Sequence, residues 1–172
     1  FLDGDSYAGP PQTDDFAPIV PRAYNAAGVA SGLQLVGVYH EVRLPNYGVF
    51  DDDRYFKPGD RCPVYNANGT PVGVNVCEDI WQAIGPTSVQ RSSCAEVIVN
   101  INGSPFHAGK RPFRERMLAT RAADISLVVA YVNMSGGQDE LVFDVSSITL
   151  RPTGESVTEA AQSEEELLLA DP

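Results

Sequence analysis

Apolar and polar positions alternate along the first half of the chain in a way that predicts short strands joined by turns. Residues 23–30 and 33–43 are strand candidates on either side of Ser31-Gly32, and residues 62–65 and 71–77 flank a turn at 66–69. Each pair predicts a hairpin, because turn-forming residues separate two runs of strand formers. Residues 1–22 hold many prolines and glycines among acidic residues, so we expect an irregular lead-in there.

The second half combines continuous apolar runs with one clear helical pattern. The runs at 95–101 and 125–134 are rich in β-branched residues, so we expect strands buried on both faces. Met117, Leu118 and Ala122 recur at helical spacing. The predicted elements are strands at 95–101, 125–134, 141–144, 146–150 and 167–170, and helices within 81–93 and over 110–124. This order is typical of an α/β fold with a mixed sheet and function at strand ends.

The run from Pro71 to Trp81 is the strongest candidate for chemistry. Strict alternation places its valines on one strand face and Cys77 at the strand's end, away from them. Glu78, Asp79 and a predicted helical turn follow, so backbone N–H groups at this corner could hold an oxyanion. A buried structural cysteine is the other interpretation, and this run alone does not separate the two.

Composition and charge narrow the classes of partner. The 172 residues suit one domain, and 12 basic against 23 acidic residues give a net charge of −11. Such a charge repels nucleic acid and anionic membranes, so we expect neither as a partner. No apolar run approaches the roughly 20 residues of a membrane span, and the start lacks a signal-peptide pattern, so we expect a cytoplasmic protein. Cys62, Cys77 and Cys94 are odd in number without CxxC spacing, which argues against a disulfide framework or a metal site.

Four stretches together carry a resemblance to a known family. They are Leu44 to Phe56, Gly73 to Trp81, Asn100 to His107 and Gly136 to Asp144. In sequence and order they are similar to the glutamine amidohydrolase domain of glutamine-dependent NAD synthetases, a branch of the nitrilase (carbon–nitrogen hydrolase) superfamily. The similarity runs from about Tyr24 to the end of the chain. One such stretch would be weak evidence, whereas four in register are specific.

The resemblance implies a fold and a mechanism. It implies an α/β, nitrilase-type four-layer α-β-β-α sandwich, with 1–172 forming a single partial domain that lacks the N-terminal strands. Cys77 would attack the side-chain amide of glutamine, release ammonia and form a thioester that water hydrolyses. Residues matching Tyr47, Glu78 and Ser104 help to bind glutamine in the family.

The resemblance also implies partners. Ammonia would pass to a synthetase domain that makes NAD from deamido-NAD, and ATP and magnesium would belong to that domain, whereas the amidase needs no cofactor. Members of the superfamily often pair their sandwiches, so we expect a homo-oligomer.

Three departures from the family pattern bear on activity. The lysine of the family's Cys-Glu-Lys triad falls on Glu41, and a carboxylate there would raise the pKa of the thiol and repel an oxyanion. Arg43, two residues further along the same predicted strand face, could return some positive charge. The triad glutamate belongs to a segment upstream of this start, so we expect the general base to be missing. Asp52 stands where the family has a second glutamate, and we expect it to support the site.

Three hypotheses therefore stay open. The first is glutamine hydrolysis through Cys77 within an NAD synthetase. The second is a catalytically impaired, nitrilase-like module that acts in assembly, and the third is an enzyme that acts on another amide or nitrile. Less specific expectations are a packed His40, a His107 that orders its loop, a solvated turn at Asp51 to Asp53, a core or interface Trp81 and salt-bridged surface arginines at 111, 114, 116 and 121.

Overall fold

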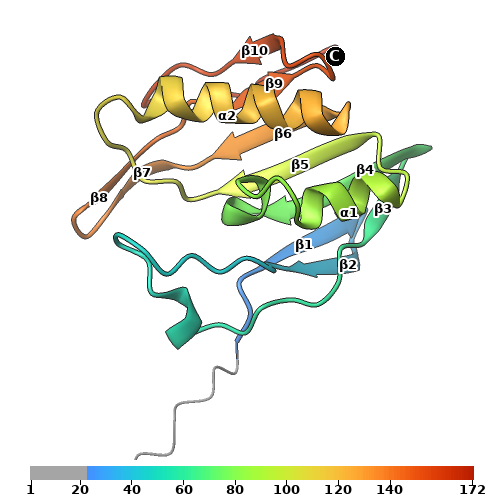
Figure 1. Cartoon of the computed structure of the whole chain (residues 1–172), viewed down its shortest axis with the longest axis horizontal. Helices are drawn as coiled ribbons and strands as arrows, with labels where there is room; N and C mark the ends of the chain where they lie inside the picture. Colours follow the sequence, from blue (N-terminus) through green and yellow to red (C-terminus); the bar gives the residue numbers. More distant parts are fainter. Residues whose placement is uncertain (1–22) are drawn as a thin grey trace, which may run out of the picture.

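A computed structural model describes residues 23–172, and the predicted lead-in at 1–22 lies outside the described residues. A mixed six-stranded sheet runs in the order β10-β9-β6-β5-β4-β3, and two hairpins, β1-β2 and β7-β8, stand beside it (Figure 1). The strands are β1 (Ala26–Ser31), β2 (Gln34–His40), β3 (Val64–Ala67), β4 (Thr70–Val76), β5 (Val97–Asn102), β6 (Val128–Asn133), β7 (Ser135–Gln138), β8 (Leu141–Asp144), β9 (Ile148–Leu150) and β10 (Ser156–Glu159). The helices are α1 (Pro86–Ser92) and α2 (Lys110–Ile125), with 3-10 turns η1 (Asp52–Arg54) and η2 (Cys77–Ile80).

The centre of the sheet is parallel and its edges are antiparallel. Strands β4, β5 and β6 pair in parallel, whereas β3 pairs antiparallel to β4, and β9 pairs antiparallel to β6. The two hairpins predicted in the first half are confirmed, with Ala26 opposite His40 in one and Ala67 opposite Thr70 in the other. The carboxyl ends of three parallel strands therefore meet at one edge, where ligand sites of open α/β sheets form.

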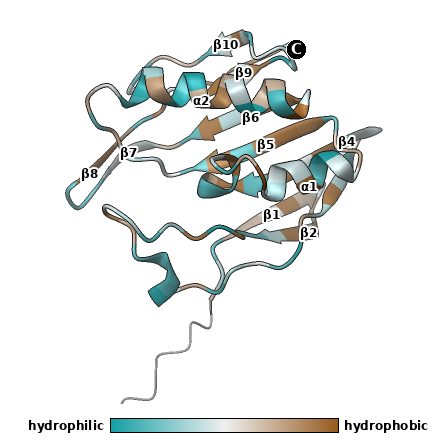
Figure 2. Ribbon diagram, viewed as in Figure 1, coloured by the Kyte–Doolittle hydropathy of each residue, from teal (hydrophilic) through white to brown (hydrophobic). Residues whose placement is uncertain are grey.

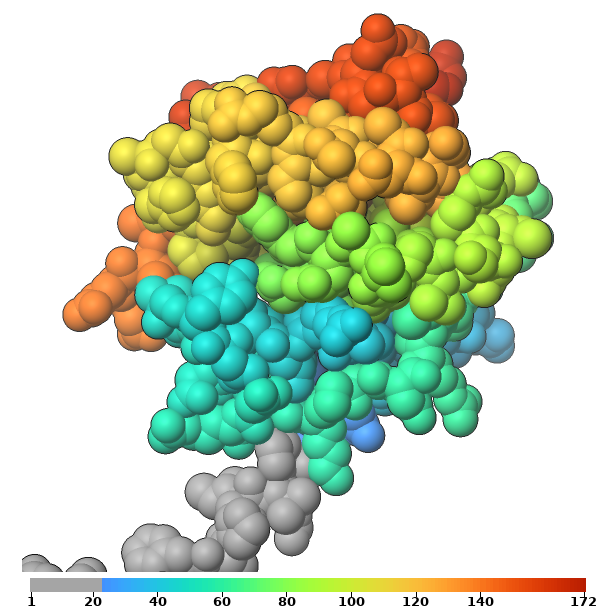
Figure 3. Space-filling model, in the orientation of Figure 1, coloured from blue at the N-terminus to red at the C-terminus, as the bar shows by residue number. Residues whose placement is uncertain are grey.

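Both helices cover one face of the sheet and close the main core. Leu118, Ala122 and Ile125 lie on the buried face of α2 and pack against Ile98 and Val129 of the sheet. Hydrophobic residues concentrate in β5 and β6 beneath them (Figure 2), and atoms of α1 and α2 cover this face in the space-filling view (Figure 3). The helical spacing of apolar residues therefore predicts correctly which side of α2 faces the sheet.

Two expectations about strands were wrong. No strand forms at 167–170, where Leu167 and Leu169 are more than four-fifths exposed, because Ser156–Glu159 pairs with β9 instead. The runs at 95–101 and 125–134 are not buried on both faces, since Ile101 and Val132 are exposed. The helices cover only one face of the sheet, and the β1-β2 hairpin packs only on the β4 side of the other.

The packing of α2 leads to a stability prediction. Replacing fully buried Leu118 with alanine is expected to lower the free energy of unfolding by about 2–5 kcal/mol, because the lost methyl groups leave a cavity. Leu118→Met, which conserves volume, is the matched control and should cost less than about 1.5 kcal/mol. Urea denaturation measures both, and equal costs for the two variants would contradict this packing.

Candidate active site

Cys77 occupies a sharp corner between β4 and η2. Its backbone has φ of 40°, a left-handed conformation that is uncommon for a residue with a side chain. The strand alternation stops at Val76, and partly buried Cys77 packs, as Val74 does, against the cluster that contains Val76, whereas the sequence predicted that it would face away from the valines. The predicted helical turn after the strand is present as η2. Such strained corners are often found at functional sites.

A single carboxylate, that of Asp79, holds this corner in place. Its Oδ2 accepts hydrogen bonds from the Tyr39 hydroxyl at 2.7 Å and the Val76 N–H at 3.1 Å, and its Oδ1 accepts from the N–H groups of Val42 and Arg43 at 3.2 and 2.9 Å. Asp79 is fully buried. It therefore ties the end of β4 to β2 and to the loop that follows β2.

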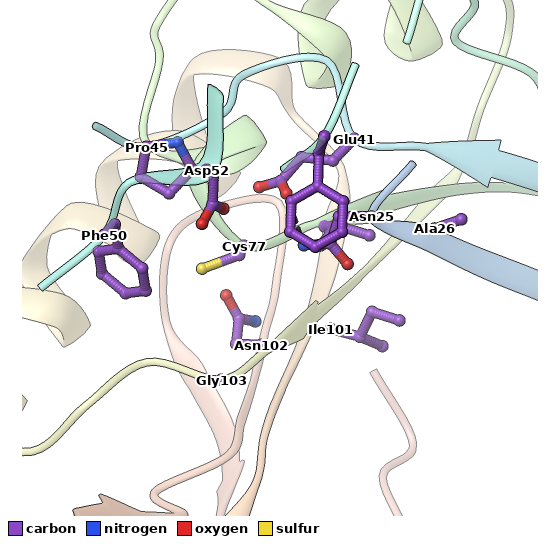
Figure 4. A pocket seen from close by; sticks show the side chains of 12 residues that line it. Asn25, Ala26, Glu41, Pro45, Phe50, Asp52, Cys77, Ile101, Asn102 and Gly103 are labelled. Atoms are coloured by element: carbon purple, nitrogen blue, oxygen red, sulfur yellow. Dashed lines mark hydrogen bonds between the residues drawn. The ribbon is translucent and has the colours of Figure 1, made fainter. Parts of the chain in front are cut away.

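Two cavities of about 400 and 410 Å³ meet at Cys77. We call the first the Glu41 cavity, and its polar lining consists of Asn25, Glu41, Asp52, Cys77 and Asn102 (Figure 4). The second, the Lys110 cavity, is lined by Tyr47, Gly48, Val49, Phe50, Cys77, Trp81, Ser104, Pro105, Phe106, His107, Lys110, Phe113 and Leu141. Phe50 also lines the first cavity, so it lies between the two. The thiol is thus accessible from an acidic side and from a largely apolar side.

Glu41 is the most unusual residue of the site. Its side chain is only 1 % exposed, and Oε2 accepts a hydrogen bond from Asn25 Nδ2 at 2.7 Å. Oε1 has no partner among the residues that the structure describes. Burial, followed by the negative charge of Asp79, raises the pKa of Glu41 from 4.5 to about 8. The Glu78 backbone N–H lies near enough to lower this pKa, although it does not satisfy Oε1. At neutral pH Glu41 is therefore largely protonated.

The surroundings of Cys77 favour the neutral thiol. Burial, followed by the negative charge of Glu41 and then by those of Glu78 and Asp52, raises the pKa of Cys77 to about 12. Lys110 at the start of α2 opposes them and lowers the pKa of the thiol. A group that removes the thiol proton is therefore needed for this cysteine to act as a nucleophile near neutral pH.

The residues expected to bind glutamine lie around the Lys110 cavity. Tyr47 and Ser104 line it, and Glu78 accepts a hydrogen bond from the Tyr47 hydroxyl at 2.6 Å. Asn133 fixes Ser104 through its backbone, accepting from the Ser104 N–H at 2.8 Å. Tyr47, Glu78 and Ser104 therefore lie in one region, next to Cys77.

Arg43 does not reach the thiol as the sequence suggested. Strand β2 ends at His40, so the alternation that placed Arg43 beside Glu41 does not apply. Arg43 is exposed and lines a third cavity, with Tyr47 and Glu78, but neither of the two cavities at Cys77. Asp52 does reach the site, because it lines the Glu41 cavity.

Sequence reasoning missed three contributors to the site. Asp79 was noted only as an acid beside Glu78, and its contacts with β2 depend on the tertiary fold. An amide ladder links Asn102, Asn100 and Asn75 through hydrogen bonds of 2.7 Å each and ends on Gln90 at 3.0 Å. Asparagines at alternate positions of apolar strands were the available signal for it. Lys110, the first residue of α2, was not predicted as a site residue, because no motif or spacing in the sequence marks it.

Lys110 carries a prediction about the thiol. Lys110→Met should raise the pKa of Cys77 and slow its alkylation at pH 8 by roughly threefold to tenfold, since one pKa unit is a factor of ten. Lys110→Arg retains the charge and is the control. The measurement is the rate of iodoacetamide labelling of the Cys77 peptide by mass spectrometry, and faster labelling in Lys110→Met would contradict the assignment.

The other residues that the sequence singled out make packing or local contacts, and Trp81 and His107 also line the Lys110 cavity. The His40 ring stacks on Tyr24 with centroids 4.0 Å apart, and Trp81 packs on the main core and on Phe113. His107 contacts the Ala108 carbonyl within its own loop, at 3.2 Å. The surface pairs expected on α2 are present for Arg111 and Arg121 with nearby acids. Arg114 is instead buried and pairs with Asp144, and Arg116 makes no ion pair within residues 23–172.

Within residues 23–172, no group of three or more His, Cys, Asp or Glu side chains is placed to hold a metal ion. No helix in the same range is long and apolar enough to cross a membrane.

The fold and the cysteine corner define a carbon–nitrogen hydrolase, and the chain belongs to that family, whose model matches residues 19–171. Among curated proteins it is similar to the glutamine-dependent NAD(+) synthetase of Thermotoga maritima, at 43 % identity over 150 residues that cover 87 % of this chain and 26 % of the relative. The corresponding protein of Aquifex aeolicus is 46 % identical over 145 residues, or 84 % of this chain and 26 % of the relative. The chain thus spans about a quarter of the length of these relatives.

Solved structures support the nitrilase-type α/β fold. Glutamine-dependent NAD+ synthetase from Acinetobacter baumannii, with ADP, matches with a TM-score of 0.80 and 37 % identity over 83 % of this chain and 27 % of that chain. An amidase from Nesterenkonia sp. AN1, with acrylamide added at its active-site cysteine, matches with a TM-score of 0.69 and 25 % identity over 80 % of this chain and 52 % of that chain. The predicted fold class and family are therefore confirmed.

Proposed function

We propose that this chain hydrolyses the side-chain amide of glutamine, with Cys77 as the nucleophile. The observation that carries the proposal is the strained Cys77 corner, which opens on two cavities beside Tyr47, Glu78 and Ser104. The family and the synthetase relatives support the choice of an amide substrate and of glutamine.

In the proposed reaction, glutamine lies in the Lys110 cavity. The Cys77 sulfur attacks the amide carbon, and the backbone N–H of Glu78 donates to the resulting oxyanion. Ammonia leaves, and water hydrolyses the thioester to glutamate and free Cys77. Tyr47, Glu78 and Ser104 would hold the amino and carboxylate ends of glutamine. Lys110 supplies the positive charge that acts on this thiol.

We further propose that the chain works as part of a glutamine-dependent NAD synthetase. Its ammonia would pass to a synthetase domain that converts deamido-NAD to NAD, and ATP and magnesium would serve that domain. We also propose a cytoplasmic location and a homo-oligomer, for which exposed Leu35 and Val36 on β2 offer apolar surface. Sedimentation of the purified protein tests the oligomer, and a monomer at all concentrations would contradict it.

Ammonia release from glutamine tests the proposed activity. The purified protein should release ammonia and glutamate in equal amounts, and Cys77→Ala should reduce the rate to background. Cys94→Ala, which removes the exposed cysteine, is the control and should retain activity. Hydrolysis that survives in Cys77→Ala would contradict the proposed nucleophile.

The second candidate function is a nitrilase-like module that binds in an assembly without catalysis. The observation that favours it is the buried Glu41 carboxyl, which stands at the position of the family lysine and helps to raise the pKa of Cys77 to about 12. This alternative predicts glutamine binding by calorimetry without ammonia release. Turnover that depends on Cys77 would exclude it.

A further inference from the structure

The carboxyl group of Glu41 is buried in a way that its neighbours do not explain. Within residues 23–172 its Oε1 has no hydrogen-bond partner, and no lysine or arginine of that range pairs with it. A buried polar atom that is left without a hydrogen bond destabilises the folded chain. An unpaired carboxyl oxygen beside a candidate nucleophile is therefore an indication of chemistry.

Position also connects Glu41 with Cys77. Both line the same cavity, where the side chains of Glu41, Asp52 and Asn102 surround the sulfur in Figure 4. Among charged groups, Glu41 has the largest effect on the pKa of the Cys77 thiol. Asn25 holds Oε2 at 2.7 Å, which leaves Oε1 free to accept or donate a proton.

We propose that Glu41 is the proton-transfer residue of this site, accepting the proton of the Cys77 thiol and returning it to the leaving nitrogen. The proposal rests on the proposed amide hydrolysis. It replaces the expectation that a carboxylate at this position only weakens catalysis.

The proton balance closes within one turnover. The Glu41 carboxylate takes the thiol proton as the Cys77 sulfur bonds to the amide carbon. Neutral Glu41 then protonates the amide nitrogen, the carbon–nitrogen bond breaks, and ammonia leaves from the thioester. Glu41, again ionised, takes a proton from the attacking water, and it returns this proton to sulfur when the carbon–sulfur bond breaks.

Charge arguments favour this transfer over a free thiolate. Moving the proton from Cys77 to Glu41 leaves the pair with one negative charge before and after the step. The repulsion between a Glu41 carboxylate and a Cys77 thiolate, which raises the pKa of Cys77, therefore does not oppose it. A pKa of about 8 also places Glu41 in the range where a general base is efficient near neutral pH. The titratable groups that interact with this pair are Tyr39 of β2, Tyr47, Asp52 of η1, Glu78 and Asp79 of η2, Lys110 of α2 and Tyr131 of β6.

Asp52 is the other carboxylate of the cavity and the less suitable base. It is partly exposed, and its charge acts on the thiol less than those of Glu41, Glu78 and Lys110. Asp52→Asn is therefore a matched control that removes a like charge from the same cavity.

The rate of Cys77 alkylation by iodoacetamide at pH 7 separates the two roles of Glu41 by sign. If Glu41 shares the thiol proton, Glu41→Gln should slow labelling about tenfold, whereas Asp52→Asn should leave it equal or faster. If Glu41 acts only as a negative charge, Glu41→Gln labels as fast as the parent protein or faster, and this result would overturn the proposal. Glu41→Asp keeps a carboxyl group and should label at an intermediate rate.

Ammonia release gives the second readout. Glu41→Gln should lower the rate of glutamine hydrolysis by about 10²- to 10⁴-fold, the usual range for loss of a general base. The parent rate should rise with pH up to about 8, as the carboxylate form accumulates. No release by the parent protein, with labelling still slowed in Glu41→Gln, would refute the proposed function and leave the proton transfer supported.

Discussion

Replacing Asp144 with alanine is expected to destabilise the protein by about 3–5 kcal/mol, because it leaves the Arg114 charge buried without a partner. Arg114 and Asp144 are 1 % and 2 % exposed, and their side chains approach to 3.2 Å. Asn133, Ser146 and Gln162 also donate to the Asp144 carboxylate, so all three lose a partner. Guanidinium chloride denaturation measures the change.

The control for this prediction is a more exposed pair that joins the same helix to β10. Arg111 Nη2 lies 2.9 Å from Glu159, and both side chains are more than a third exposed. Glu159→Ala should cost less than about 1 kcal/mol, because solvent screens exposed pairs. If both alanine variants lost the same stability, the buried pair would not have the role given to it here. Asp144→Ala should also loosen Ser104, since Asn133 contacts both residues.

The second large effect is a pH dependence of stability that arises from Glu41. Below pH 4.5 the carboxyl is protonated in both the folded and the unfolded chain. Between about 4.5 and 8 the unfolded chain ionises while the folded chain keeps its proton, so stability falls as pH rises and levels off above 8. The expected loss is on the order of a few kcal/mol.

Glu41→Gln isolates this contribution. The glutamine side chain cannot ionise, and it keeps an oxygen that can accept the hydrogen bond from Asn25. The variant should therefore become more stable than the parent protein as the pH rises from 5 to 8. Denaturation curves at pH 5, 6.5 and 8 measure the difference. Parallel pH profiles for the two proteins would show that Glu41 is not buried as the structure places it.

Local patterns predicted most of the fold. The structure confirms the turn at 66–69, the strand predicted from the apolar run that forms β5, and the helix predicted from the spacing around Leu118. Each of these patterns depends on residues that are close together in the sequence. The edge of the sheet was less predictable. Both 156–159 and 167–170 can form a strand, and only pairing with β9, a tertiary contact, selects the first.

Several residues of the site could be predicted from the sequence, whereas their arrangement in space could not. The corner at Cys77 and the family resemblance identified Cys77, Glu41, Asp52, Tyr47 and Ser104, which line the two cavities, but not Lys110 or Asn102. The position of Arg43 was wrong because alternation was extended beyond the end of β2. Asp79 joins β4 to the loop after β2, and Glu41 is buried with one carboxyl oxygen unpaired among the described residues. Both features depend on packing between segments that are distant in the sequence, so no local pattern predicts them.

The most direct test of the central claim is to locate the adduct formed by an electrophilic glutamine analogue. Peptide mass spectrometry should place one adduct per chain on Cys77 and none on Cys62 or Cys94, and millimolar glutamine should slow its formation. An adduct spread over the three cysteines, or one that glutamine does not slow, would contradict a glutamine site at Cys77.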